Sequence, residues 1–154
     1  MYVFGGLTKD KELKNDLWVV RPYFKKNKEI MDPKRFEFPE GEEPRFYYEL
    51  ARLEPEGRAP VARYGHSMVH LGRNLFVFGG RNDAIYATTS TICLNDLNVY
   101  NIERNRWEPI AMFGKIPCSR MGLAMSTYES KIILFGGIKL DGFVHPNQVQ
   151  FFEV

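Results

Sequence analysis

The chain has 154 residues, with 21 lysine and arginine residues against 19 aspartate and glutamate residues, so its formal net charge is only +2. This balance argues against a nucleic-acid partner or an acidic membrane surface, because counterion release requires a concentrated basic face. Hydrophobic residues at 44% and charged residues at 26% are typical of globular proteins. No apolar run approaches the roughly 18 residues that span a bilayer.

The sequence predicts an all-β fold of short strands. Aromatic residues make up 14% of the chain, which favours strands, and no segment repeats its apolar residues at helical spacing. NLFVF at 74–78 and KIILF at 131–135 are continuously apolar and bounded by polar residues or glycine, as in strands buried on both faces. In chain order, we expect ten strands, at residues 2–5, 16–21, 46–52, 65–71, 74–78, 96–101, 106–112, 122–128, 131–135 and 147–153.

Three of the apolar runs end in a pair of glycines, Gly5 and Gly6, Gly79 and Gly80, and Gly136 and Gly137. The second and third pairs close a longer repeat, because residues 63–80 align without gaps with residues 120–137 and 6 of 18 positions are identical. The two windows begin 57 residues apart, within the range of radial repeat architectures. Glycine at these positions permits a sharp turn after the strand.

A segment that begins with asparagine follows each glycine pair, at 15–20, 95–100 and 147–152, and Trp107 follows the second of them. This set of motifs resembles the kelch repeat, whose units carry a double glycine after the second strand and an aromatic residue on the fourth. The resemblance covers most of the chain and implies blades of four antiparallel strands. It assigns the late aromatic position to Trp107 in the middle unit and to Tyr48 in the first.

The resemblance implies an incomplete kelch-type β-propeller of about two and a half to three blades. Blade one covers residues 1–53, blade two 62–112 and blade three 119–154, which is incomplete. Closed propellers hold about four to eight blades, and an open stack would expose apolar faces. We therefore expect either a part of a larger propeller, the favoured explanation, or closure with a second copy. Expressed alone, the chain is expected to self-associate or to be poorly soluble.

Residues 22–45 form an insert before the last strand of blade one. The insert carries six basic and six acidic residues, so its composition predicts a solvated surface loop. Long loops on rigid scaffolds often carry function, which leaves a docking loop for a partner as the alternative. Residues 81–94 form a second long loop after the middle glycine pair.

The sequence does not match the catalytic motifs that its residues suggest. The segment 65–69 lacks the final glycine of a G-x-S-x-G nucleophile elbow and lies at a strand start, so Ser67 is not expected to be a nucleophile. His66 and His70 share a strand face by even spacing, with His145 as the remaining imidazole. We therefore expect packed or hydrogen-bonded histidines rather than a zinc site.

Cofactor and compartment signals are also weak. Cys93 and Cys118 stand 25 positions apart with no C-x-x-C motif, which indicates neither a disulfide framework nor a zinc cluster. Without a signal-peptide pattern at the N-terminus, we expect a reducing, cytoplasmic compartment. No phosphate-binding glycine motif occurs, so no cofactor is expected. Core packing explains Trp107 better than a stacking platform for nucleic acid, because no basic groove accompanies it.

Three arginines form the candidate site. Arg63 and Arg120 begin first strands and Arg81 follows the end of a second strand, so an up-and-down blade brings all three to one face. The chain is similar here to the kelch substrate adaptors of cullin ligases, whose arginines at these positions bind acidic peptides. Leu7 and Ile138 replace the arginine after the other two glycine pairs. The structural alternative is that Arg63 and Arg120 bind loop carbonyls or neighbouring carboxylates.

The expected function is a non-catalytic interaction module that recognises a protein or an acidic peptide through one loop face, with solvent-accessible guanidinium groups. One alternative is a scaffold or regulatory segment of a larger enzyme, such as a kelch-containing serine/threonine protein phosphatase. A second is a propeller oxidase similar to galactose oxidase, which would need a copper site of Cys, Tyr and His.

Overall fold

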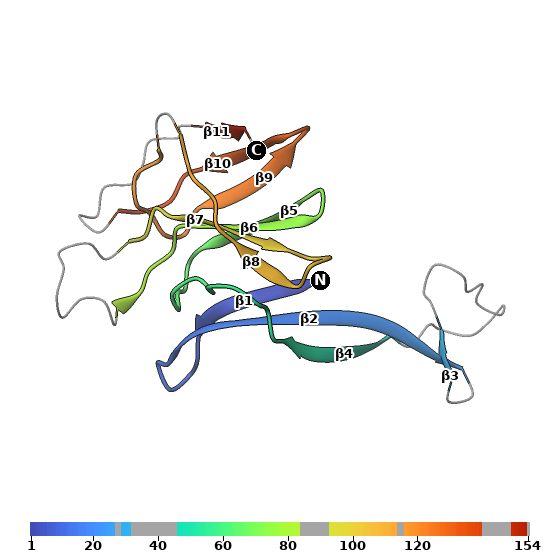
Figure 1. The fold of residues 1–154 in the computed structure, drawn as a ribbon. Helices are drawn as coiled ribbons and strands as arrows, with labels where there is room; N and C mark the ends of the chain where they lie inside the picture. Colours follow the sequence, from blue (N-terminus) through green and yellow to red (C-terminus); the bar gives the residue numbers. More distant parts are fainter. Residues whose placement is uncertain (27–28, 32–45, 84–92, 114–115, 140–148, 154) are drawn as a thin grey trace. The chain divides into compact units, whose positions relative to one another are not determined.

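The computed structural model describes residues 1–26, 29–31, 46–83, 93–113, 116–139 and 149–153. These residues contain eleven strands in three antiparallel sheets and no α-helix, which confirms the all-β prediction (Figure 1). Each of the ten expected strands is present, with differences at the ends. The chain divides into two compact units, one of residues 1–3 and 17–53 and the other of residues 4–16 and 54–154.

The first sheet contains β1 (Tyr2–Leu7), β2 (Leu13–Lys26), β3 (Glu29–Met31) and β4 (Phe46–Leu53). β2 is its central strand and pairs with the other three. Strands β1 and β2 contribute residues to both units, whereas β3 and β4 belong to the first.

The insert at 22–45 differs from the predicted surface loop. β2 continues to Lys26 and pairs there with β3, so that the beginning of the insert is strand rather than loop. The reason lies in its aromatic residues, since Tyr23 faces Tyr47 across the β2–β4 pair with ring centroids 5.7 Å apart. Such cross-strand aromatic pairs stabilise sheets. Residues 32–45 lie outside the described residues.

In the first sequence repeat, the residue at the late aromatic position of the kelch motif also differs from the expectation. In the second sheet, Trp107 lies opposite Tyr100 and is buried. The residue of the first sheet that corresponds to Tyr100 is Val20, and its cross-strand partner is Leu50. The register therefore gives this position to Leu50 instead of Tyr48, whose side chain is exposed.

The second sheet is a complete four-stranded blade. Its strands β5 (Ser67–Leu71), β6 (Asn74–Phe78), β7 (Leu97–Asn101) and β8 (Arg106–Glu108) are adjacent in sequence order and antiparallel. A tight turn with Gly72 in the left-handed region joins the first two strands. This is the arrangement that the repeat pattern predicts for blade two.

The third sheet contains β9 (Ala124–Tyr128), β10 (Lys131–Phe135) and β11 (Gln150–Glu153) in the order β11–β10–β9. Its inner face packs on the second sheet, and each fully buried Leu, Ile or Phe stabilises such a core by about 1.5–3 kcal/mol. The core between the two sheets consists of Phe76, Phe78, Leu97, Val99, Leu123, Ile132 and Leu134.

The glycine pairs allow the backbone of the next sequence repeat to approach them closely. Gly79 has φ +69°, and a Cβ atom there would lie 2.6 Å from the carbonyl oxygen of Arg120. The next amide, of Gly80, donates a hydrogen bond to that oxygen at 2.9 Å. The Gly6 amide donates to the Arg63 oxygen at 2.8 Å in the same way. The double glycine is thus required by the junction between successive units.

A short segment covers the outer edge of the second sheet. Residues 54–57 run along β8, where Glu56 forms a parallel bridge with Arg106. The Trp107 amide donates to the Glu56 oxygen at 2.8 Å. Gly57 permits this approach, because it has φ +82° and a Cβ atom there would lie 2.3 Å from the Trp107 oxygen.

Candidate functional site

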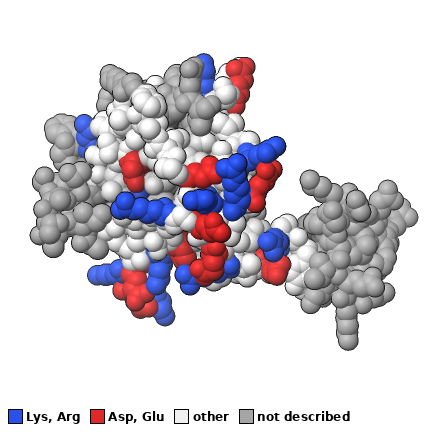
Figure 2. All heavy atoms as spheres, in the orientation of Figure 1, with Lys and Arg blue, Asp and Glu red and all other residues white. Residues whose placement is uncertain are grey.

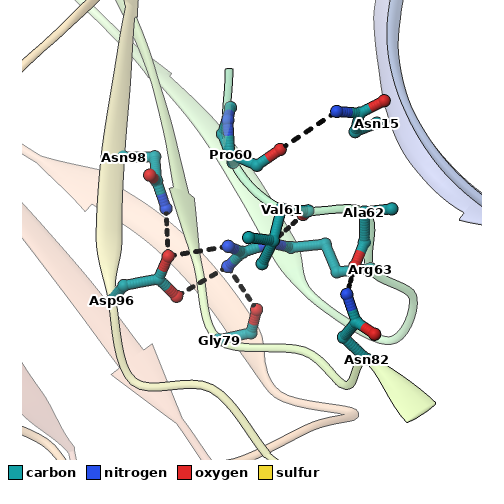
Figure 3. A network of polar contacts seen from close by, with 9 residues as sticks. All are labelled: Asn15, Pro60, Val61, Ala62, Arg63, Gly79, Asn82, Asp96 and Asn98. Carbon is teal, nitrogen blue, oxygen red and sulfur yellow. Dashed lines mark hydrogen bonds and ion pairs between the residues drawn. The ribbon is translucent and has the colours of Figure 1, made fainter. Parts of the chain in front are cut away.

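Arg63 lies directly before the first strand of the second sheet, and its side chain is completely buried. Its guanidinium group donates to the oxygen of Gly79 at 2.9 Å and to both carboxylate oxygens of Asp96 at 2.7 and 2.6 Å (Figure 3). Nε donates to the Val61 oxygen at 3.0 Å. Arg63 therefore joins the start of the first strand to the end of the second and the start of the third.

Arg120 repeats this arrangement in the third sheet. Its side chain is also fully buried, with Nε donating to the Cys118 oxygen at 3.1 Å and Nη1 donating to the Gly136 oxygen at 3.0 Å. The expectation that the guanidinium groups of Arg63 and Arg120 are reachable by solvent is therefore wrong. At the second and third glycine pairs, the arginine thus supplies a hydrogen-bond donor for the carbonyl oxygen of the first glycine.

Asp96 balances the buried charge of Arg63. Burial alone would raise the pKa of Asp96, but the hydrogen bonds and positive charge of Arg63 outweigh it. Asn98 Nδ2 adds a hydrogen bond to the carboxylate at 2.8 Å, and the pKa of Asp96 is lowered from its ordinary value as a result. The carboxylate thus stays ionised and paired at neutral pH.

Arg81 is the predicted arginine that remains accessible, with its side chain 32% exposed. Its guanidinium group forms an ion pair with Asp83 and lies 6.0 Å from the centre of the Tyr64 ring. Tyr64 completes the cluster by donating its hydroxyl hydrogen bond to Asp83 at 3.1 Å. Partial burial and this hydrogen bond raise the pKa of Tyr64. We call Tyr64, Arg81 and Asp83 the Arg81 cluster.

In the second and third sheets, backbone pairing joins the middle residue of the Arg-x-Gly motif to the residue after the glycine pair. Tyr64, the middle residue of Arg-x-Gly, forms an antiparallel bridge with Arg81, the residue after the glycine pair. Met121 and Ile138 form the same bridge in the third sheet. These bridges pair the two positions at the same end of each of these sheets, whereas the side chains of Arg63 and Arg120 are buried.

A groove of about 610 Å³ lies beside the Arg81 cluster. Apolar residues from the end of β1 and the start of β2 form part of its wall, and the loop after the second glycine pair forms another part. Asn82 is fixed there by a hydrogen bond from Nδ2 to the Ala62 oxygen at 2.7 Å (Figure 3). The residues that line the groove are Leu7, Lys11, Leu13, Ala62, Asn82 and Asp83.

Sequence reasoning singled out Leu7 as the residue that replaces the arginine after the first glycine pair, but it missed Lys11, Leu13 and Asp83. A signal existed for Asp83, because a carboxylate two positions after an exposed arginine is a candidate ion-pair partner. No spacing rule pointed to the other two.

The rejected catalytic candidates His66, Ser67 and His70 do not line this groove. His66 packs its ring against Phe4 at 5.4 Å, and burial together with the Arg63 charge lowers the pKa of His66 to about 4. Ser67 is the first residue of β5, and His70 is exposed on the same strand. No group of three or more His, Cys, Asp or Glu side chains in the described part of the chain could hold a metal ion.

The cysteines and surface charges give no further chemistry. Cys93 and Cys118 are thiols rather than members of a disulfide, the first buried and the second half-buried. Figure 2 shows basic and acidic side chains interspersed on the visible face, with no patch of one sign among the residues coloured there. Within the residues that the structure covers, no helix has the length and apolar character needed to cross a membrane.

Comparison with known proteins agrees with the geometry. The family model described as KLHDC2/KLHL20/DRC7 Kelch-repeats domain matches residues 1–154. Tip elongation aberrant protein 1 of Schizosaccharomyces pombe is 30% identical over 141 residues, which are 92% of this chain and 10% of that protein. Rho GTPase-activating protein gacHH of Dictyostelium discoideum is 33% identical over 82 residues, 53% of this chain and 5% of that protein.

Kelch domain-containing protein 3 of Bos taurus is 33% identical over 89 residues, covering 56% of this chain and 22% of that protein. The chain thus spans less than a quarter of the length of each of these three relatives. The glycine pairs, the buried arginines and the four-stranded second sheet fit the same repeat. The chain belongs to the kelch-repeat family.

Proposed function

We propose that this chain is a non-catalytic protein-interaction module of the cytoplasm, and that it binds its partner through the loop face around the Arg81 cluster. Kelch-repeat domains typically bind protein partners. The observation that supports this surface is the groove beside an accessible ion pair, at the end of the blade where both repeat positions meet. The same proposal includes a role of this chain as a scaffold within a longer protein, which the much greater length of its relatives supports.

The partner in this proposal is a peptide that carries an acidic side chain next to an apolar one. A carboxylate of the peptide exchanges with Asp83 for the guanidinium group of Arg81, whose planar fork binds carboxylates through two parallel hydrogen bonds. The apolar side chain enters the groove between Leu7 and Leu13. Arg63 and Arg120 contribute indirectly, by fixing the loops that carry this surface.

The exchange predicts opposite effects for the two members of the ion pair. A hydrogen bond to a charged group contributes about 1.5–3 kcal/mol, part of which is offset by loss of the Asp83 pair, so Arg81→Ala should weaken binding about tenfold. Asp83→Asn removes the competing carboxylate of an exposed pair and should strengthen binding by up to about fivefold.

The experiment isolates a partner by pull-down and maps the bound peptide. The affinity of this peptide for wild type, Arg81→Ala and Asp83→Asn is then measured by calorimetry. Arg73→Ala is the matched control, because Arg73 also forms an exposed ion pair, with Glu103 at 3.1 Å, but lies in the turn at the other end of β5. Weaker binding by Asp83→Asn would contradict the exchange. If shortening residues 32–45 abolishes binding while Arg81→Ala leaves it unchanged, the insert is the docking element and the loop face is not.

A further inference from the structure

The turn between β1 and β2 holds a lysine at a position that hairpins usually give to glycine. The Lys11 amide donates a hydrogen bond to the Thr8 oxygen at 3.0 Å, and the Thr8 amide donates to the Glu12 oxygen at 3.0 Å. A hairpin loop closed in this way places its last residue in the left-handed region, where glycine is favoured. Lys11 has φ +63° there, so its backbone is strained by its own Cβ atom.

The location of Lys11 distinguishes it from the other residues with this strain. Among the described residues, Asn105 and Glu129 also combine a side chain with a positive φ. Asn105 connects its turn to a neighbouring segment, since its Nδ2 donates to the Glu54 oxygen at 3.0 Å. Glu129 lies in the turn between β9 and β10 and does not line the groove. Lys11 does line the groove, so its side chain can serve binding there.

The charge of Lys11 is not used in an ion pair within the part of the chain that the structure describes. Its neighbour Glu12 pairs with Lys14 at 2.6 Å instead. Asp83, the acidic residue that lines the groove, pairs with Arg81. The groove therefore carries one positive charge that no described carboxylate neutralises.

The wall of the groove comes from two parts of the chain, which belong to the same compact unit of residues 4–16 and 54–154. The end of the β1–β2 hairpin forms one part, and the loops of the second sheet form the other. Lys11 belongs to the first part, whereas the Arg81 cluster adjoins the second. A peptide whose apolar side chain lies in the groove thus meets a cation on each part of the wall.

We propose that Lys11 binds a second carboxylate of the peptide, so that the groove selects an apolar side chain with an acidic residue on either side of it. This inference rests on the proposed function, in which Arg81 binds the first carboxylate. Charge complementarity favours such a peptide over one with a single acidic residue. The ammonium group of lysine is a point charge on a flexible stem, so the second contact needs no fixed geometry.

The test uses four synthetic pentapeptides, Gly-X-Leu-Z-Gly, in which X and Z are each glutamate or glutamine. Both ends are capped, so that only the side chains carry charge, and affinities are measured by NMR titration of the labelled protein. The peptide with two glutamates should bind wild type about threefold more tightly than either peptide with one, as expected for an exposed ion pair. Lys11→Gln should remove this preference, and Lys11→Arg should retain it.

Two control variants separate the charge of Lys11 from other effects. Lys9→Gln removes a charge from an exposed lysine of the same turn that does not line the groove, and it should keep the preference. Lys11→Gly should lose the preference while its melting temperature rises by about 2 °C, because glycine relieves the strain. Glu129→Gly relieves similar strain at the repeat position of Gly72 and should leave binding unchanged.

The outcomes distinguish this inference from the function on which it rests. If Lys11→Gln keeps the preference for two glutamates, or if wild type has none, the second contact is overturned, whereas a tenfold loss for Arg81→Ala still supports the proposed function. A Lys11→Gly variant that melts below wild type would overturn it too, because the lysine would then serve the fold. If no acidic peptide binds more tightly than the one with two glutamines, the inference and the proposed function both fail.

Discussion

His66 should make the stability of the fold acid-sensitive, and the repeat itself supplies the substitution that tests this. The residue at the same repeat position in the next unit is Leu123, which is buried in the core. We predict that His66→Leu removes most of the loss of stability between pH 7.5 and pH 4. The exposed His70 on the same strand provides the control.

The magnitude follows from the surroundings of the imidazole. Burial and the charge of Arg63 lower the pKa of His66 from 6.5 to about 4, against the opposing hydrogen bond with the Phe4 backbone. Its Nδ1 atom is buried without a hydrogen-bond partner among the described residues. Because the folded pKa is the lower one, the unfolded state binds the proton first as the pH falls through 6.5. Stability is then lost until His66 itself is protonated near pH 4, by about 3 kcal/mol in total.

Urea unfolding at fixed protein concentration, measured in steps from pH 7.5 to pH 4, checks the prediction. Wild type and His70→Gln should lose about 3 kcal/mol of unfolding free energy over this range, whereas His66→Leu should lose much less. Asp96 acts in a different window, because its lowered pKa retains its contribution until the pH falls below its ordinary value of 3.8. If His66→Leu loses stability as steeply as wild type, the burial of His66 does not control the acid response.

Two further predictions concern the repeat motif. Arg63→Met should destabilise the fold by about 3 kcal/mol, because it leaves a half-buried carboxylate and a carbonyl without their donor. Arg81→Ala breaks an exposed ion pair and should cost less than about 1 kcal/mol. Similar losses of unfolding free energy for the two variants in urea would contradict the different burial of the two arginines. Gly79→Ala and Gly136→Ala both force alanine to φ near +70°, at about 1–2 kcal/mol, but only the alanine at 79 meets a backbone atom. The loss at Gly79 should therefore exceed that at Gly136 by about 1–3 kcal/mol in thermal unfolding, and equal losses would refute the role of the close approach.

The repeat pattern made the sheets predictable, because glycine pairs such as Gly79 and Gly80 mark the ends of second strands and a gapless match fixes the spacing between units. The extension of β2 was hidden, since the charges of residues 22–45 mask two aromatic residues that pair across the sheet. Strand order alone predicted that Arg81 lies at the end of the blade where the first strand begins, and Arg81 pairs there with Tyr64.

The sequence offered the binding of Arg63 to a loop carbonyl and a carboxylate as the structural alternative, and the structure shows these contacts, but the sequence could not decide between this alternative and an accessible side chain. The position of Arg63 at a strand start is visible in the sequence, but a guanidinium group on a flexible side chain can turn toward solvent or toward the protein. The choice depends on Asp96, which is 33 residues away in the chain and has no sequence rule that connects it with Arg63. The charge balance of the loop face depends in a similar way on Asp83, which neutralises the accessible arginine.

The segment 54–57 limits how other proteins can bind the edge of the second sheet. An uncovered edge strand offers its amide and carbonyl groups to any extended chain, because backbone hydrogen bonding does not depend on sequence. Along β8, the backbone of Glu56 occupies groups that such a chain would use, and Gly57 makes this possible by its close approach to Trp107. Recognition at this sheet must then come from side chains at loop ends and faces, where identity matters. A side chain at position 57 would collide with the Trp107 oxygen and weaken this cover, which would leave more of the β8 edge open to strand addition.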